Sequence, residues 1–109
     1  MTYDLRLVRG DHGHATDVTL VSQRTGAPID VAGATVRLYL RQVGAAELRA
    51  TIIASLPGGG TDGRARFVWP AGALDVAGDY EGEIEITAGT VVQSVYRKLA
   101  IHVREQVQV

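Results

Sequence analysis

The sequence predicts an all-β protein built from two packed sheets. Apolar and polar side chains alternate with a period of two in seven short segments, which places successive side chains on opposite faces of half-buried strands. Turn-forming stretches rich in glycine and proline separate these segments, and almost none of the chain has a convincing helical pattern. Seven short strands divided by turns are typical of a sandwich or a small barrel, and we favour the sandwich.

Four of the predicted strands lie in the N-terminal half, and the third has the clearest two-sided pattern, with Arg37, Tyr39 and Arg41 on its polar face. Residues 45–54, which overlap the fourth segment, contain enough alanine, glutamate and leucine to form a helix in isolation. We favour a strand there because β-branched residues stand at positions 51–53. The four predicted strands span residues 3–7, 18–20, 36–41 and 48–56.

Three further strands are predicted in the C-terminal half, at residues 65–69, 80–87 and 91 to about 104. Residues 57–63 (PGGGTDG) are expected to form a flexible, exposed connector, because so many glycines disfavour regular structure. Residues 71–77 are expected to connect two strands, with room for one helical turn.

The last two strands are predicted to form a hairpin with Gly89 and Thr90 at its turn. Counting outward from this turn pairs Ile84 with Val95, Glu81 with Lys98, and Tyr80 with Leu99. Each such apolar or oppositely charged cross-strand pair contributes about 0.2 to 1 kcal/mol.

The same register of the hairpin places Arg97 opposite Gly82, on the face that should be buried. Two explanations remain open. Arg97 fills the space over the glycine at a sheet edge, or a bulge shifts the register there.

The composition limits the possible functions. A length of 109 residues predicts one domain covering residues 1–109. Eleven basic and twelve acidic side chains leave a net charge of −1, which argues against a nucleic-acid partner. No apolar run is long enough for a membrane-spanning helix, so no membrane span is expected. The absence of cysteine excludes disulfides and thiolate catalysis, and it suits synthesis in a reducing cytoplasm.

Two aromatic residues are candidates for structural or interface roles. Tyr80 follows Gly78 and Asp79 at the start of a late strand, as in the tyrosine corner of immunoglobulin-like sandwiches, where the hydroxyl bonds to nearby backbone. We interpret Tyr80 as structural, with ligand contact as the alternative. Trp69, the only tryptophan, is expected in the core or at its rim. The alternative for Trp69 is a sugar-stacking platform or an interface anchor.

The chemistry available for catalysis or metal binding is sparse. His12 and His14, beside Asp11, are weak candidates for metal ligands, because a closed site needs further ligands that the sequence does not identify. Ser22, Ser55 and Ser94 stand in no nucleophile motif. We therefore expect no enzymatic activity, no metal and no cofactor.

Two charged stripes are predicted on the strand faces. Arg37 and Arg41 line one strand, and Glu81, Glu83 and Glu85 line another. Solvated sheet faces explain both stripes. The alternative is that they form complementary surfaces that bring repeated copies into a symmetric assembly.

The order of these motifs resembles the immunoglobulin-like N-terminal domain of phage baseplate upper proteins and related prophage tail proteins. The resemblance covers most of the chain and is carried by YDLRLVRGD, TGAPIDVAGATVRLYLR, GRARFVWPAGALDVAGDYEGEIEIT and the closing LAIHV. It implies an immunoglobulin-like β-sandwich of about seven antiparallel strands. It also implies a domain that anchors a receptor-binding apparatus through protein contacts, with no catalytic residues.

The function expected from this resemblance is that of a non-enzymatic bacteriophage virion protein. It would act as a tail or baseplate adaptor or a tail-tip component, forming homo-oligomers and binding other phage structural proteins on the particle after synthesis in the bacterial cytoplasm. Larger members of the family carry a long C-terminal region that is not in this sequence. The alternative is a capsid-decoration or carbohydrate-binding module, in which Trp69, Tyr39 or Tyr96 stacks on a host surface glycan.

Overall fold

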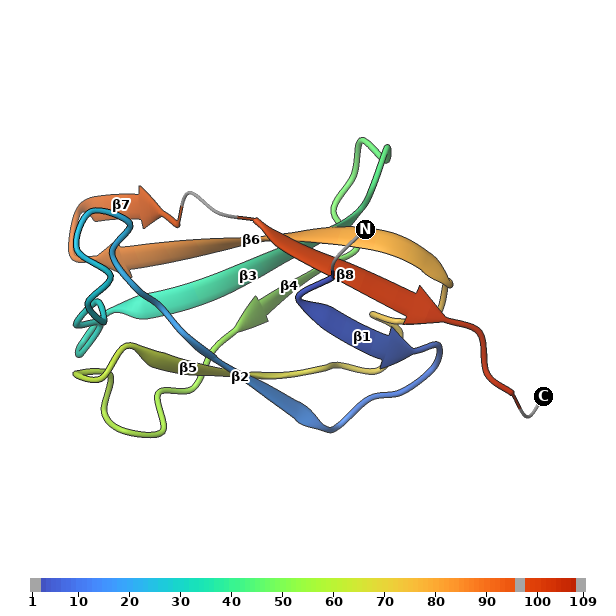
Figure 1. Cartoon of the computed structure of the whole chain (residues 1–109), viewed down its shortest axis with the longest axis horizontal. Helices are drawn as coiled ribbons and strands as arrows, with labels where there is room; N and C mark the ends of the chain where they lie inside the picture. Colours follow the sequence, from blue (N-terminus) through green and yellow to red (C-terminus); the bar gives the residue numbers. More distant parts are fainter. Residues whose placement is uncertain (1–2, 96–97, 108–109) are drawn as a thin grey trace.

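The computed structural model describes residues 3–95 and 98–107, and this part of the chain is all-β (Figure 1). It contains eight strands and no helix, so it also contains no helix that could cross a membrane. The all-β prediction is therefore confirmed. The strands are β1 (Leu5–Val8), β2 (Ala15–Thr19), β3 (Thr35–Gln42), β4 (Ala50–Ile53), β5 (Arg64–Val68), β6 (Gly78–Ala88), β7 (Val91–Ser94) and β8 (Leu99–Arg104).

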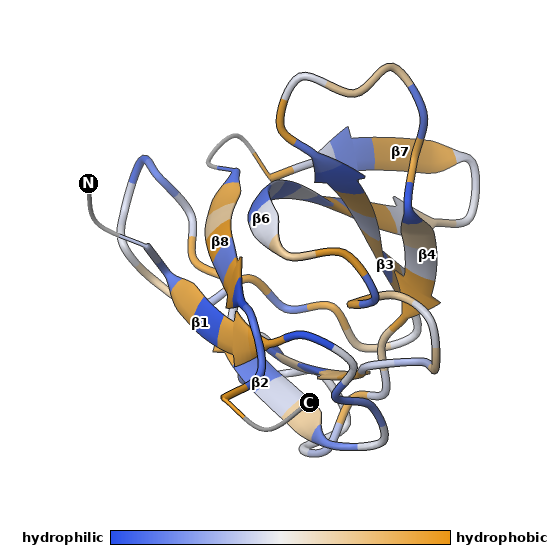
Figure 2. Cartoon of the chain, turned by 90° about the vertical axis from the view of Figure 1, so that its right-hand side faces the viewer, coloured by the Kyte–Doolittle hydropathy of each residue, from blue (hydrophilic) through white to orange (hydrophobic). Residues whose placement is uncertain are grey.

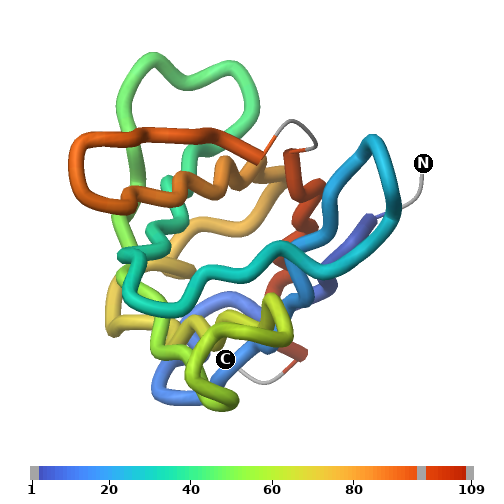
Figure 3. The backbone as a smooth tube through the Cα atoms, turned by 90° about the vertical axis from the view of Figure 1, so that its left-hand side faces the viewer, coloured from blue at the N-terminus to red at the C-terminus, as the bar shows by residue number. Residues whose placement is uncertain are grey.

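The strands form a six-stranded main sheet and a two-stranded sheet. The main sheet has the order β1-β8-β6-β3-β4, and β7 pairs with β6 beside β8, while β2 and β5 form the second sheet. The expectation of about seven antiparallel strands holds in part: the described chain has eight strands, and their pairs are antiparallel except that β1 runs parallel to β8. The main sheet curls into a half-barrel (Figure 3), and this shape is not clearly an immunoglobulin sandwich.

The two sheets meet at the end of β4. The Ser55 amide donates to the Arg66 carbonyl at 2.9 Å, and the Arg66 amide donates to the Ser55 carbonyl at 2.8 Å. These bonds connect β4 to β5, so the chain continues from the main sheet into the smaller one.

The core lies inside the curl and contains the apolar side chains that alternation predicts. On β3, the side chains of Val36, Leu38 and Leu40 are buried, while the residues between them remain partly exposed. Figure 2 shows the same alternation of polar and apolar residues along the strands. Burying a side chain of this size contributes about 1.5 to 3 kcal/mol, so the paired strands hold together mainly through this inner face.

Gly82 interrupts the apolar inner row of β6, and the structure gives the reason. A Cβ atom at this position would lie 2.8 Å from Cδ1 of Leu38, a side chain that is itself buried. The space next to Gly82 is therefore already filled, and any larger residue would force the core apart.

The connector at residues 57–63 differs from its prediction. Gly60 and Gly63 are buried, and their carbonyls accept hydrogen bonds from the amides of Val31 and Leu20 at 2.9 and 2.8 Å. At Gly63, φ is 76° and a Cβ would approach the Leu20 carbonyl to 2.7 Å. The expectation of a flexible, exposed connector is wrong at these two glycines, because they allow the backbone to pack closely against the 20–31 segment.

Two local predictions concerned a choice between helix and another conformation. Residues 50–53 form β4, so the strand predicted within residues 48–56 is confirmed. Residues 71–77 contain no helix. The Ala73 amide donates to the Pro70 carbonyl at 3.2 Å in a turn, and the side chains of Ala73 and Leu74 enter the core.

The predicted hairpin forms near its turn. Ala88 pairs with Val91 and Glu85 with Ser94, as counted from Gly89 and Thr90, and the Val95 amide donates to the Ile84 carbonyl at 2.8 Å. The predicted return strand is then divided into β7 and β8.

Beyond this point the predicted register is wrong by two residues. Tyr80 pairs with Ile101 instead of Leu99, and Glu81 pairs with Ala100 instead of Lys98. A shift of two preserves which side chains face the core, so the alternation is kept even though the partners change. This interruption agrees with the bulge explanation, and Arg97 itself lies outside the described residues.

Candidate functional site

The two charged stripes predicted from the sequence lie side by side on the outer face of the main sheet. The register between β3 and β6 places Arg37 opposite Glu85, Tyr39 opposite Glu83, and Arg41 opposite Glu81. Side chains directly opposite each other on one face of a sheet are close enough to interact. The stripes therefore form a single polar surface within one chain.

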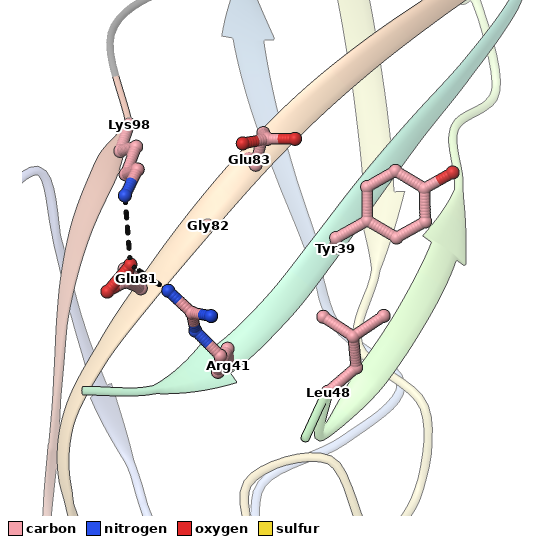
Figure 4. Close-up of a pocket in the computed structure, with 7 residues that line it drawn as sticks. All are labelled: Tyr39, Arg41, Leu48, Glu81, Gly82, Glu83 and Lys98. Carbon is pink, nitrogen blue, oxygen red and sulfur yellow. Dashed lines mark hydrogen bonds and ion pairs between the residues drawn. The ribbon is translucent and has the colours of Figure 1, made fainter. Parts of the chain in front are cut away.

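Glu81 is the centre of an ion-pair cluster on this surface. Its Oε1 atom lies 2.9 Å from Nη2 of Arg41 and 3.2 Å from Nζ of Lys98 (Figure 4). The hydrogen bond from Arg41, followed by the one from Lys98, lowers the pKa of the Glu81 carboxyl. The predicted pairing of Glu81 with Lys98 thus exists as an ion pair, although the two residues are not directly opposite each other.

Glu85 forms an ion pair with the second arginine of the surface, Arg37. Its Oε1 lies 3.8 Å from Nη1 of Arg37 and accepts a hydrogen bond of 2.9 Å from the Tyr39 hydroxyl. This hydrogen bond raises the pKa of Tyr39. The arginine and glutamate stripes are largely paired with each other inside the chain, and this argues against the alternative in which they join separate copies.

A pocket of about 320 Å³ opens on the same surface. Tyr39 and Leu48 supply its apolar wall, and the polar side chains around it are Arg41, Glu81, Glu83 and Lys98. Figure 4 shows the carboxylate of Glu83 apart from the ion-pair cluster, between Lys98 and the Tyr39 ring. The pocket exists because the 43–49 connection carries Leu48 to the side of the β3–β6 pair, which the sequence pattern did not indicate.

A second polar cluster lies on the outer face of β6 and β8, where it is joined by Tyr3, two residues before β1. Oδ1 of Asp79 accepts a hydrogen bond from the Tyr3 hydroxyl at 3.0 Å and lies 2.8 Å from Nδ1 of His102. The bonds from His102 and then Tyr3 lower the pKa of Asp79, and the Tyr3 pKa is raised by the same contact. Sequence reasoning missed this cluster, since its members are far apart in the chain.

The structure places Tyr80 in the core. The side chain is 1% exposed, and its hydroxyl donates to the Val76 carbonyl. The hydrogen bond predicted for a tyrosine corner is therefore present.

Trp69 is also 1% exposed, and its Nε1 donates to Oγ1 of Thr16 at 2.9 Å. This confirms the expectation that it packs in the core. The ring cannot serve as a sugar platform or interface anchor without leaving the core. Of the other aromatic residues considered for glycan stacking, Tyr39 is half-buried on the outer surface, and Tyr96 lies outside the described residues.

His12 and His14 are exposed in the loop between β1 and β2. Within residues 3–95 and 98–107, no three histidine, cysteine, aspartate or glutamate side chains come together as potential metal ligands. The loop is instead held by its backbone, because the Gly13 amide donates to the Trp69 carbonyl and the Trp69 amide donates to the His14 carbonyl.

Two strands expose apolar side chains at opposite edges of the main sheet. On β4, Ile53 is 64% exposed, and on β7, Val91 and Val92 are 63% and 62% exposed. Each strand is paired along only one edge in the described part of the chain. A groove of about 490 Å³ lies between residues 93–95, at the end of β7, and the connection formed by residues 21–29.

Comparison with known proteins does not assign the chain to a family. No family model matches the sequence, and no curated protein matches it. The function must therefore be inferred from the residues and from their arrangement.

Proposed function

We propose that this protein is a non-enzymatic structural component of a bacteriophage particle, a tail or baseplate adaptor or tail-tip component. It acts through protein–protein contacts, and repeated copies assemble into a homo-oligomer that binds other structural proteins of the particle. Its place of action is the virion, on the tail or the particle surface.

The sequence resemblance to phage baseplate upper proteins supports this role, and one structural detail supports an immunoglobulin-like relationship. The bond between the Tyr80 hydroxyl and the Val76 carbonyl is the contact expected of a tyrosine corner. We propose that the half-barrel is a variant of that fold, in which β1 joins the main sheet in parallel with β8.

The observation that carries the assembly proposal is the chemistry of the two sheet edges. Neither β4 (ATII) nor β7 (VVQS) contains a charged residue, and both expose β-branched apolar side chains. Proteins that remain monomeric commonly protect such edges with charges, prolines or covering loops. Unprotected edges favour the addition of a strand from another chain.

The positions of these edges favour a head-to-tail contact. When β7 of one copy adds to β4 of the next, the two surfaces differ, so the contact repeats and closes into a ring if the rotation permits. A ring of identical adaptors is a suitable platform on a symmetric particle.

Two substitutions test this contact. Val92→Lys adds a charge to β7 and Ile53→Lys adds one to β4, both at exposed positions where the fold should tolerate them. We expect the unmodified protein to be oligomeric and each variant to be monomeric in size-exclusion chromatography with light scattering. Val107→Lys, at a 90% exposed position outside the sheets, is the matched control and should assemble normally.

Mixing the two variants distinguishes a head-to-tail contact between β7 and β4 from a contact between two β7 strands. Each variant keeps one intact edge, so an equimolar mixture should form dimers and nothing larger. Contacts between two β7 strands would instead be abolished by Val92→Lys and unaffected by Ile53→Lys. A wild-type protein that stays monomeric at all concentrations would overturn the homo-oligomer proposal.

The location on the particle requires a separate test. Mass spectrometry of purified particles and electron microscopy with a labelled antibody should find the protein on the tail. Its absence from particles would overturn the virion role, whatever the oligomeric state.

A further inference from the structure

We propose that the pocket between Tyr39, Leu48 and Glu83 binds the guanidinium group of an arginine side chain presented by a protein partner. The juxtaposition of an aromatic ring, an aliphatic side chain and a carboxylate that has no partner in the described part of the chain carries this inference. It goes beyond the proposed function and does not depend on which sheet edges join the copies.

The first step concerns the charges that line the pocket. Arg41 and Lys98 both bind the same oxygen of Glu81, at 2.9 and 3.2 Å. Glu83 is exposed and has no hydrogen-bond or ion-pair partner among the described residues. One negative charge is therefore available to a ligand, while the neighbouring cations are already paired.

The second step concerns the ring of Tyr39. Its hydroxyl is held by Glu85 at 2.9 Å, so the ring is fixed in position before any ligand arrives. Figure 4 shows the Glu83 carboxylate and the Leu48 side chain near the ring, with Glu83 on β6 and Leu48 in the connection before β4. A cation close to the face of an aromatic ring is attracted by the ring's quadrupole, and arginine makes this contact more often than lysine.

The third step concerns the shape of the ligand. A planar guanidinium can stack on the ring and donate two parallel hydrogen bonds to one carboxylate, which a lysine ammonium cannot do in the same way. The alkyl part of an arginine would lie against Leu48. At about 320 Å³, the pocket is at the small end of ligand sites, and it suits one side chain whose backbone stays on the sheet surface.

The test uses the full chain, labelled with nitrogen-15, and a blocked tripeptide, acetyl-Gly-Arg-Gly-amide. We expect saturable NMR shifts at Tyr39, Leu48 and Glu83, with affinity in the millimolar range that one exposed, partly screened contact allows (about 1 mM). The citrulline peptide has the same shape without the charge, and it should bind about tenfold more weakly or not at all. A lysine peptide that binds as tightly as the arginine peptide would overturn the assignment to guanidinium.

Matched variants connect the binding to the named residues. Glu83→Gln should weaken binding about tenfold, whereas Glu47→Gln, which removes the same charge from the adjacent exposed connection, should leave it unchanged. Tyr39→Phe keeps the ring but loses the hydroxyl bond that holds it, so it should bind more weakly than the unmodified protein, and Tyr39→Leu should lose binding. Equal weakening by Glu83→Gln and Glu47→Gln would mean that only the general charge of the surface matters.

One further variant tests for competition within the chain. If Arg97→Gln bound the peptide and the unmodified protein did not, the chain's own arginine would be the occupant. That result would overturn the proposal of a partner's arginine. It would leave the edge-assembly proposal untouched, because Val92→Lys and Ile53→Lys act at other surfaces.

Discussion

Tyr80 combines two roles in one side chain. Its ring fills the core at the start of β6, and its hydroxyl reaches back to the carbonyl of Val76 in the preceding connection. Burial also raises the pKa of Tyr80, so the hydroxyl stays protonated and remains a donor across the neutral range. The residue therefore fixes the direction in which the chain enters its longest strand.

The first prediction is that Tyr80→Phe lowers the free energy of unfolding by about 1 kcal/mol, the usual contribution of one hydrogen bond. Urea unfolding followed by the fluorescence of Trp69 measures this, because Trp69 is buried in the same core. Tyr39→Phe is the matched control, since it removes a hydroxyl bond from a half-buried side chain on the outer face of β3, outside the core, and should cause a smaller loss. Equal losses would show that the Val76 contact has no special role.

At the scale of elements, the pairing of β3 with β6 determines the properties of the outer surface. Taken separately, β3 carries a basic stripe and β6 carries an acidic stripe, and each stripe alone would attract molecules of opposite charge. Pairing them in register lets the charges neutralise each other, with Arg41 and Lys98 both bound to Glu81. Among the described residues, the Glu83 carboxylate of this surface stays without a hydrogen-bond or ion-pair partner, and it lies beside the ring of Tyr39.

The ion-pair cluster predicts a pH dependence. The pKa of Glu81 is lowered in the folded protein, so its contribution to stability is present above the unfolded-state pKa and is lost as the pH falls through the folded-state pKa. We expect Glu81→Gln to cost below about 1 kcal/mol at neutral pH, because the partners are exposed to solvent. In acid, Glu81→Gln and the unmodified protein should have the same free energy of unfolding.

Denaturant unfolding at a series of pH values measures this difference. Asp17, Asp62 and Asp79, whose pKa values are also lowered, are present in both proteins, so the comparison isolates Glu81. Glu83→Gln removes the same charge from the same strand without breaking a described ion pair, and it should cost less at neutral pH. If the difference in free energy of unfolding between Glu81→Gln and the unmodified protein stayed constant with pH, this would contradict the proposed stabilisation by the ion-pair cluster.

At the scale of the whole molecule, stability should be graded from the centre of the main sheet to its edges. β3 and β6 are paired on both sides and carry much of the buried core, whereas β7 pairs along one edge and has four exposed residues. Strands with few buried contacts open at low free-energy cost. The edge proposed for assembly is therefore also the least protected part of the sheet.

Amide hydrogen exchange tests this gradient. We expect the amides of β3 and β6 to exchange slowest and those of β7 to exchange fast. The measurement should use the Val92→Lys variant, so that assembly does not protect β7. Protection of β7 equal to that of β3 in this variant would contradict the graded stability.

Local sequence patterns were sufficient for most of the strands and for the core positions on β3 and β6. Alternation with a period of two identified the buried side chains of β3 and β6, since the direction of a side chain in a strand depends only on its parity. The tight turn at Gly89 and Thr90 likewise determined the pairing at the start of the hairpin, because the first cross-strand pairs follow by counting outward from these two residues.

Contacts between distant segments could not be predicted from those local patterns. The parallel pairing of β1 with β8, the curl of the sheet and the two-residue shift before β8 all depend on which segments pack together. Tyr3 meets Asp79 across a separation of 76 residues, and Leu48 reaches the pocket from a connection with no periodic signal. Parity is a property of each strand alone, whereas partners and register are chosen by burial of the whole core, and so the candidate site emerged only once the chain had folded.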